Sequence, residues 1–309
     1  MVSAKGGSLR DELSMDASPT MFDTAHVLAA GFAAGAAGHD RDASFPFENF
    51  DRLSEAGLLA LTVPTALGGL GAGARDAVRI INIFGKAEVS TALVLSMHYI
   101  QHLLMARSTR WPNRLVRKLA RETVEGVALI NALRVEPDLG SPSRGGLPAT
   151  IARRTATGWR LTGRKIYSTG APILKWYAVW ARTDEPVARV GLFLVPAGLP
   201  GTRIVETWDH LGLRASGSHD VIFDDVVFPL DHEIDVRKPD DWRVPDFTQA
   251  TVHAIFVAAI YDGIARIQLD IRVILGGNAG ERRTRLALAA GADHQDLVAR
   301  QLEIGRAHV

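Results

Sequence analysis

Cysteine is absent from the 309-residue chain, which excludes disulfide bonds, cysteine-bound zinc, iron–sulfur clusters and thiol nucleophiles together. Positive and negative side chains nearly balance, because the formal net charge is +1. We therefore expect no nucleic-acid partner and no polybasic membrane anchor. The polar first residues lack the apolar stretch of a secretory signal, and no uninterrupted apolar run is long enough to span a membrane. These absences predict a cytoplasmic enzyme with no membrane partner.

Two kinds of periodicity divide the chain. Up to about residue 125, apolar side chains recur at helical spacing, as Phe47, Phe50 and Leu53 do. From residue 126 onward, short runs rich in β-branched and aromatic residues alternate with turn residues, which indicates strands. Helices followed by strands favour an α+β fold. We predict an α-helical domain over residues 1–125, an antiparallel β-barrel-like domain over 126–235, and the start of an α-helical bundle over 236–309.

The same patterns give bounds for single elements. A last helix over 247–274 is apolar nearly all round, so it must be buried in a bundle or at a subunit interface. The other helices are predicted over 23–38, 47–57, 74–87, 91–106 and 112–123. Strands are predicted over 128–135, 149–154, 159–168, 176–182, 191–195, 202–205 and 221–227.

Two motifs have open interpretations. His98 and His102 are four residues apart on one predicted helix, but no third ligand accompanies them, so no metal site is expected. For either histidine, a place in a cavity and a hydrogen-bonded place in the core both remain open. The segment EPDLGSPSRGG, residues 136–146, offers N–H groups, hydroxyls and an arginine to a phosphate or a polar ring edge. An ordinary surface loop explains it equally well.

Four segments in order resemble acyl-CoA dehydrogenases. The first, FPFENFDRLSEAGLLALTVPTALGGLG, is similar to the entry helix and loop of that family. The next three, LRVEPDLGSPSRGGLPAT, GWRLTGRKIYSTG and WDHLGLRASGSHDVIFDDVVFP, resemble its middle-domain signatures in the expected order and spacing. The resemblance covers about residues 45–270 and implies an FAD bound against the middle domain.

The resemblance also implies which residues contact FAD and substrate. Tyr167 would stack on the flavin ring, Ser168 follows it, and Thr169 would hydrogen-bond near N5. Ser141 would meet both the flavin and the pantetheine–phosphate part of a CoA thioester. His98 and Tyr99 would line the substrate pocket. The remaining cofactor residues implied by the resemblance are Ala132, Leu133, Arg134, Val135 and Glu136.

The family's reaction is the α,β-dehydrogenation of an acyl-CoA thioester with hydride transfer to flavin N5. Its carboxylate base aligns with His253, which is therefore the catalytic candidate, with a structural helix histidine as the alternative. The resemblance implies a homo-oligomer that passes electrons to electron-transfer flavoprotein or another acceptor. It fades after Ile274, so we expect an incomplete or frame-shifted C-terminal domain and an inactive fragment.

Two other functions remain open. The same fold supports reduced-flavin-dependent monooxygenases, and the two histidines His98 and His253, together with the missing glutamate, favour that reaction. The serine-rich loop at 136–146 favours the dehydrogenase. A non-catalytic remnant without a cofactor is the third possibility.

Overall fold

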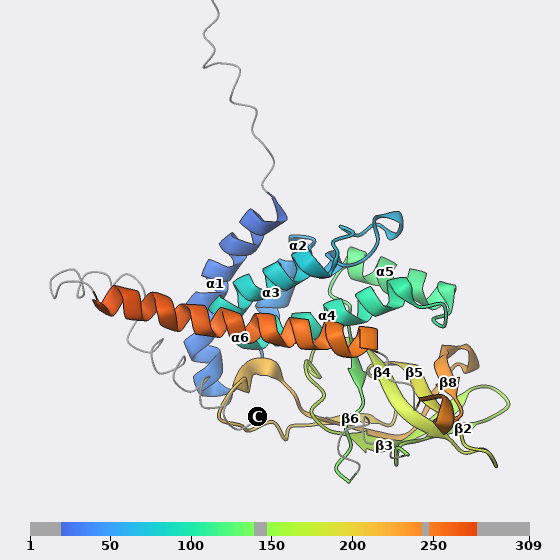
Figure 1. Ribbon diagram of the computed structural model, residues 1–309. Helices are drawn as coiled ribbons and strands as arrows, with labels where there is room; N and C mark the ends of the chain where they lie inside the picture. The colour runs from blue at the N-terminus through green and yellow to red at the C-terminus, as the bar shows by residue number, and fades with distance from the viewer. Residues whose placement is uncertain (1–19, 139–146, 243–246, 277–309) are drawn as a thin grey trace, which may run out of the picture.

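The computed structural model describes residues 20–138, 147–242 and 247–276, with side chains up to residue 267 in the last range. Within these ranges, helices lie on one side and a curled sheet on the other (Figure 1), which confirms the α+β fold class. The helices are α1 (Met21–Asp42), α2 (Phe47–Glu55), α3 (Ala74–Ala87), α4 (Val89–Arg107), α5 (Asn113–Glu125) and α6 (Phe247–Gly276). The strands are β1 (Leu129–Leu133), β2 (Ile151–Arg154), β3 (Trp159–Lys165), β4 (Leu174–Thr183), β5 (Val190–Pro196), β6 (Thr202–Val205), β7 (Asp220–Phe228) and β8 (Glu233–Arg237).

Helices α1 and α4 begin two residues before their apolar patterns predict, because polar residues cap their first turns. Thr20 Oγ1 accepts a hydrogen bond from the N–H of Asp23 at 3.2 Å, and the Asp23 carboxylate accepts one from the N–H of Thr20 at 3.1 Å. Glu88 caps α4 by accepting from the N–H groups of Ser90 and Thr91 at 2.9 and 2.6 Å. Such caps satisfy the first N–H groups of a helix, which hydrophobic periodicity does not reveal.

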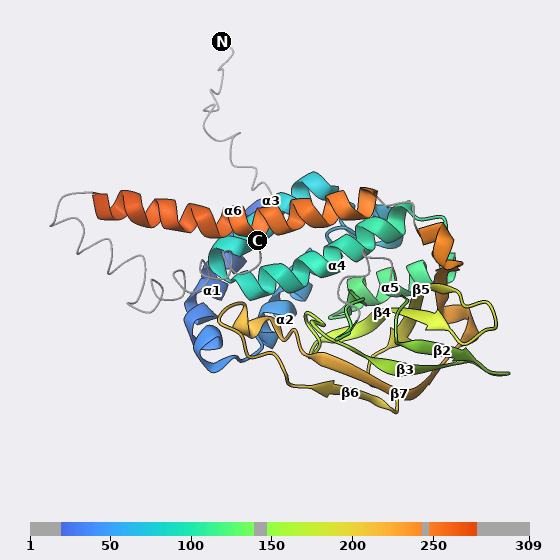
Figure 2. The ribbon, with the colours of Figure 1, turned by 60° about the horizontal axis from the view of Figure 1, so that its bottom comes forward.

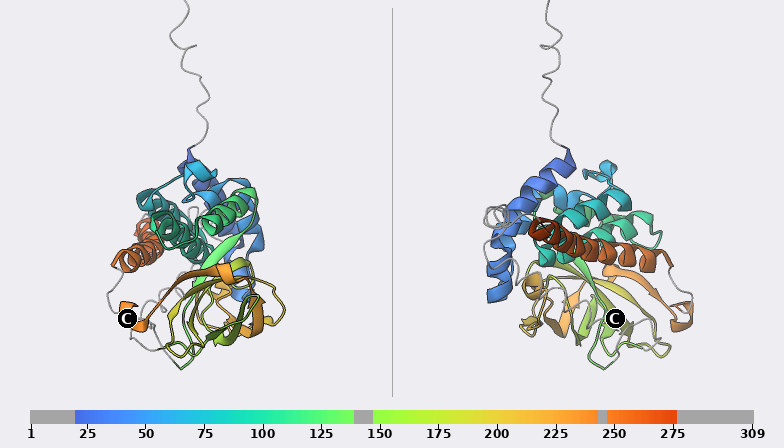
Figure 3. Two further views of the ribbon diagram at one scale, coloured as in Figure 1. Left: turned by 90° about the vertical axis from the view of Figure 1, so that its right-hand side faces the viewer. Right: turned by 60° about the vertical axis from the view of Figure 1, so that its left-hand side comes forward.

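The strands form one sheet in the order β6-β7-β3-β2-β4-β5-β8, with β1 paired to β4. It curls into a half-barrel (Figure 3). The prediction of an antiparallel sheet is wrong for two pairs, because β1 and β2 both run parallel to β4. The chain between the partners is long enough for the crossover that a parallel pair needs. Strand β8 was not predicted, because three of the five residues in EIDVR are charged.

Helix α4 lies at the centre of the helical layer and contacts α3, α5, α6 and β1. Helix α6 crosses α3 and α4 on their outer side (Figures 1 and 2). Glycines allow the close approach of α3 and α6: a Cβ on Gly85 would lie 3.2 Å from the carbonyl oxygen of Ile260, and one on Gly263 would lie 2.9 Å from that of Asn82. A large apolar core joins the helices to the sheet, and a second apolar cluster joins α5 to β1, β4 and β5.

Two described helical segments are long and apolar enough to cross a membrane by length and composition alone, α4 and residues 247–267 of α6. In α4, 72% of the apolar window is buried, as in the core helix of a folded protein, whereas the share in α6 is 28%. The prediction that α6 is buried is confirmed on one side only: Phe256 and Ile260 are buried, but Phe247 and Ile255 are exposed. The outer side presents apolar surface of the type that mediates association.

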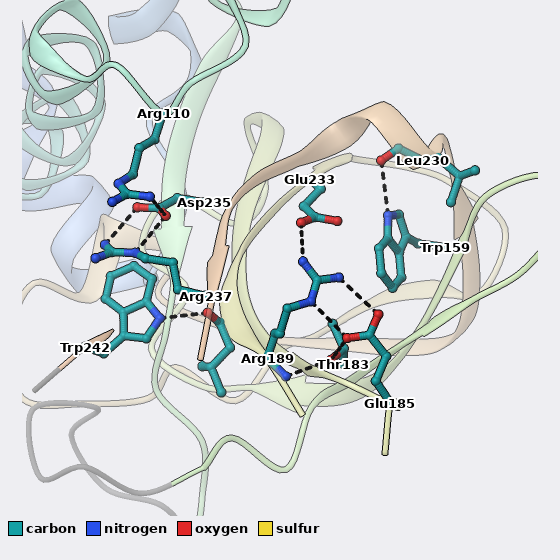
Figure 4. Close-up of polar contacts among 11 residues, drawn as sticks. Arg110, Trp159, Thr183, Glu185, Arg189, Leu230, Glu233, Asp235, Arg237 and Trp242 are labelled. Carbon is teal, nitrogen blue, oxygen red and sulfur yellow. Dashed lines mark hydrogen bonds and ion pairs between the residues drawn. The ribbon is translucent and has the colours of Figure 1, made fainter. Parts of the chain in front are cut away.

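A charged network holds the edge of the sheet where β8 pairs with β5 (Figure 4). Arg189 Nη1 donates to Glu233 Oε1 at 2.7 Å, and its Nε donates to Glu185 Oε2 at 2.9 Å. The hydrogen bond to Glu185, followed by that to Glu233, raises the pKa of the guanidinium. Trp242 Nε1 donates to the carbonyl oxygen of Val190 at 2.7 Å. The chain beyond β8 is thereby fastened to β5.

We expect Arg189→Met to lower the free energy of unfolding by about 1–2 kcal/mol, because two partly buried carboxylates lose charge-assisted hydrogen bonds. Urea denaturation at neutral pH measures the change. Arg41→Met is the control, because the Arg41–Asp42 ion pair is exposed on both sides and such pairs contribute little. Equal urea midpoints for the two variants would contradict this role of Arg189.

Candidate functional site

The turn after β3 presents an exposed aromatic ring. Tyr167 has a φ of 54°, and 54% of the residue is exposed. A left-handed backbone at a bulky residue is uncommon, and such conformations cluster at functional sites. The ring meets Trp208 edge-on with centroids 6.1 Å apart, and the His210 ring lies 4.0 Å from that of Trp208. Three rings from two segments thus form one aromatic surface.

Hydroxyl groups lie beside this surface. The N–H of Ser168 donates to the carbonyl oxygen of His219 at 3.0 Å, which holds the turn against residues 216–219. Thr169 Oγ1 lies 3.0 Å from Ser218 Oγ. The Ser168 hydroxyl is buried and has no hydrogen-bond partner among the described residues. Because a buried hydroxyl normally has a partner, this one is available to a ligand or a water.

The end of β1 lies next to the same turn. Asn131 Nδ2 donates to the carbonyl oxygen of Thr169 at 3.0 Å, and the carbonyl oxygen of Val135 accepts a backbone N–H from the segment before the turn at 3.0 Å. Ala132 and Val135 are partly exposed, whereas Leu133 is buried in the core. The end of the predicted cofactor strand therefore lies beside the turn, while the Leu133 side chain packs inside.

Arg134 connects β1 to α6. Its guanidinium carbon lies 5.0 Å from the centroid of the Trp180 ring, and Nη2 donates to Gln249 Oε1 at 3.4 Å. The predicted catalytic residue His253 follows one helical turn after Gln249. Desolvation by the surrounding atoms lowers the pKa of His253, and the nearby charge of Arg134 lowers it further. The pKa of His253 therefore lies below its usual value, and the residue is exposed on α6.

The side chain of Glu136, a predicted cofactor residue, is part of the core. Its carboxylate accepts from Lys165 Nζ at 2.5 Å and from the N–H groups of Ala149 and Thr150 at 2.6 and 3.1 Å. Burial raises the pKa of Glu136, but Lys165 and these donors outweigh burial and leave the pKa below its usual value. Burial lowers the pKa of Lys165 to about 8, although Glu136 opposes this shift. The buried ion pair holds the strand ends together instead of contacting a ligand.

His98 and Tyr99, the predicted substrate residues, also lie in the core with fully buried side chains. His98 Nδ1 accepts from the N–H of Ile130 at 3.2 Å, and Nε2 lies 3.1 Å from the carbonyl oxygen of Leu59. The Tyr99 hydroxyl donates to the carbonyl oxygen of Leu58 at 2.6 Å. Every polar atom of both side chains has a partner. The structure therefore gives them the core role that the sequence left open and does not support contact with substrate.

An apolar pocket of about 50 Å³ lies between α4 and α6 and was missed by the sequence analysis. No carboxylate is among its lining residues. The sequence carries one signal for this pocket. On each of the two helices, apolar side chains recur at a spacing of three or four residues, and the two helices pack together in the structure. The lining residues are Val89, Leu93, Leu213, Val257, Ile260, Tyr261 and Ile264.

Together, the described residues around the turn fit a planar heterocycle with a polar rim. Tyr167 offers a ring face, and Ser168 and Thr169 offer hydroxyls to the rim. The end of β1 lies beside them. Such a set is suited to an isoalloxazine ring. Ser141 lies outside the described residues, so its predicted contact with cofactor and substrate remains a prediction.

Two family profiles match the chain. Residues 21–124 match the acyl-CoA dehydrogenase N-terminal domain, and residues 134–226 match the acyl-CoA dehydrogenase middle domain. The first range holds helices α1 to α5, and the second holds strands β2 to β6, most of β7 and the turn with Tyr167.

Proteins named for different reactions are similar to this chain. YdbM from Bacillus subtilis, a protein assigned to the acyl-CoA dehydrogenases, is 30% identical over 252 residues, which is 80% of this chain and 63% of YdbM. L-evernosamine nitrososynthase from a Micromonospora species is 31% identical over 284 residues, 89% of this chain and 66% of that enzyme. The chain thus spans just under two thirds of each relative. The solved structure of KijD3, which holds FMN and a dTDP-linked amino sugar, aligns with a TM-score of 0.72 and 28% identity over 92% of this chain and 74% of KijD3.

Proposed function

Because the chain belongs to the acyl-CoA dehydrogenase family, we propose that it is a flavin-dependent oxidoreductase whose flavin lies against the 167–169 turn and the end of β1. Within the family we propose the monooxygenase reaction, in which a nucleophilic nitrogen or sulfur atom of a small substrate is oxidised. The cofactor is FMN or FAD, since KijD3 holds FMN and the sequence resemblance implies FAD.

One observation carries the choice of reaction. The pocket between α4 and α6 is lined by apolar residues and Tyr261, without a carboxylate, and Glu136, the carboxylate just beyond β1, is locked to Lys165. Dehydrogenation of a thioester needs a base that removes the α-proton. Oxidation of an amine or thioether does not, because the lone pair of the substrate atom is itself the nucleophile. The described site therefore suits the second reaction better.

The residues of the proposed site have separate roles. When bound and reduced, the flavin supplies two electrons to molecular oxygen, so that one oxygen atom goes to the substrate and the other leaves as water. Tyr167 and the hydroxyls of Ser168 and Thr169 orient the ring system. The apolar pocket holds the apolar part of the substrate and excludes water.

The proposal is tested with purified chain loaded with FMN or FAD, reduced without oxygen and then mixed with air and a panel of primary amines and thioethers. We expect oxygenated product with one panel member, together with less hydrogen peroxide than in the absence of substrate. Free reduced flavin without protein is the control. A chain that retains neither flavin would refute the flavin-dependent function altogether.

The second candidate is the α,β-dehydrogenation of an acyl-CoA, which the similarity to YdbM favours. In that reaction His253 would be the base. Oxidised flavin on the chain is mixed with butyryl-CoA and longer acyl-CoAs without oxygen. We expect no loss of the yellow flavin absorbance, since a carboxylate base is not among the described residues that line the pocket. Bleaching by an acyl-CoA would establish dehydrogenation and overturn the monooxygenase proposal.

A further inference from the structure

A second pocket lies between three helices, away from the proposed flavin site. Helices α1 and α6 both pack on α3 (Figure 1), and residues of all three helices line a pocket of about 450 Å³. Pockets that bind small molecules have volumes of about 300–1,000 Å³. None of the lining residues lies on β1 or on the 167–169 turn, and none lines the apolar pocket between α4 and α6. The pocket is therefore large enough for a ligand of its own.

One part of the lining is apolar. The side chains of Phe22, Val78 and Ile83 face the pocket, and all three residues are only partly buried. Removal of apolar surface from water is favourable by about 25 cal/mol per Å². An apolar ring or a short hydrocarbon chain in the pocket would cover this surface, whereas a small inorganic ion would not.

The charged part of the lining is predominantly positive. Among the described residues that line the pocket, three are cationic and one is acidic: Arg79, Lys86 and Arg266 against Asp262. Arg266 Nε donates to Asp262 Oδ2 at 2.7 Å, and Asn82 Nδ2 donates to the same oxygen at 2.8 Å. The single carboxylate is thus neutralised inside the lining. Arg79 and Lys86 leave the pocket with a positive potential, which attracts an anion.

The Arg79 guanidinium is oriented by an aromatic ring. Its central carbon lies 3.9 Å from the centroid of the Phe22 ring, so the two planar groups are in contact. The Asp76 carboxylate is 3.7 Å from Arg79 Nη1, which is longer than a hydrogen bond, and 59% of the Arg79 side chain is exposed. A guanidinium held against a ring presents its N–H groups at its edge, where a carboxylate can accept two parallel hydrogen bonds.

We propose that this pocket binds an organic carboxylate with a small apolar body. Arg79 binds the carboxylate, Lys86 adds electrostatic attraction, and Phe22, Val78 and Ile83 cover the apolar body. The ligand is a second small molecule besides the flavin and the substrate of the oxidation. The inference does not depend on the proposed function, because the two sites share no residue.

The test compares 1-naphthoate with 1-naphthamide, which has the same ring system without the charge. Isothermal titration calorimetry measures the binding of both compounds to the flavin-free chain at about pH 8, where histidines are ordinarily uncharged. The variants are Arg79→Gln, which removes the guanidinium, and Val78→Trp, which fills the apolar part of the pocket. Arg75→Gln is the matched control, because Arg75 is also exposed on α3 but does not line the pocket. Melting temperatures are recorded for every variant.

We expect the unmodified chain and Arg75→Gln to bind naphthoate about threefold to tenfold more tightly than naphthamide, as a charge-assisted contact at a partly exposed site provides. Arg79→Gln should bind the two compounds equally, with its affinity for naphthamide unchanged, and Val78→Trp should weaken the binding of both. A preference for naphthoate that survives Arg79→Gln, or no binding of naphthoate by the unmodified chain, would overturn the proposal. Flavin retention is measured separately, and its absence would refute the proposed function alone.

Discussion

Replacement of Lys165 by methionine is expected to lower the melting temperature of the protein by roughly 10 °C, because a buried ion pair that loses one partner costs about 3–5 kcal/mol. Lys165 is 0% exposed and Glu136 is 2% exposed, so the remaining carboxylate cannot reach water. It would keep only the N–H groups of Ala149 and Thr150. Differential scanning calorimetry at neutral pH measures the change.

The double variant Glu136→Gln/Lys165→Met distinguishes the lost ion pair from a simple packing defect. A neutral amide at position 136 still accepts a hydrogen bond from the backbone and leaves no buried charge, so we expect the double variant to be more stable than Lys165→Met alone. The control is Arg153→Met, since the Arg153–Asp184 pair is exposed on both sides and its loss should leave the melting temperature nearly unchanged. Additive losses in the double variant would refute the charged pair.

The helices and most strands could be predicted because burial imposes a period on the sequence. Phe50 and Leu53, both fully buried, mark the inner face of α2, and the alternating burial of β3 follows from its two faces. Strand direction could not be predicted, since the same alternation suits a parallel and an antiparallel neighbour. Strand β8 could not be predicted, because the sequence shows Glu233 and Asp235 only as charged residues. The ion pairs that hold them in the strand are visible only in the structure.

The candidate site was predicted only in part, and from the family resemblance instead of from periodicity. The turn at Tyr167 was found through the family resemblance, whereas Ser216 and Ser218 were not, because serines in a turn carry no periodic signal. Ser218 contacts Thr169, 49 positions earlier by subtraction of residue numbers, and Ser216 contacts Ser218. Contacts so distant in sequence are set by the fold, which a motif does not report.

Acid is expected to destabilise the protein through His98. Burial lowers the pKa of this imidazole to about 4, although the hydrogen bond to Leu59 opposes the shift, and the usual value in an unfolded chain is about 6.5. Between these pH values the unfolded chain binds a proton that the folded chain excludes. The free energy of unfolding therefore falls as the pH drops through this window, by roughly 2 kcal/mol at about pH 5 for His98 alone.

His98→Gln isolates this contribution, because an amide can still accept from the N–H of Ile130 or donate to the carbonyl oxygen of Leu59 without titrating. We expect the variant to be less stable than the unmodified chain at neutral pH but to lose less stability on acidification, as urea denaturation at about pH 7 and about pH 5 measures. His102, whose pKa burial also lowers, with a further lowering from His98, keeps part of the acid sensitivity in both proteins. His26→Gln alters an exposed histidine on α1 and serves as the control. If His98→Gln and the unmodified chain lost the same stability on acidification, the folded chain would not exclude a proton from the His98 imidazole. A charged His98 ring would then fit between Leu59 and Ile130.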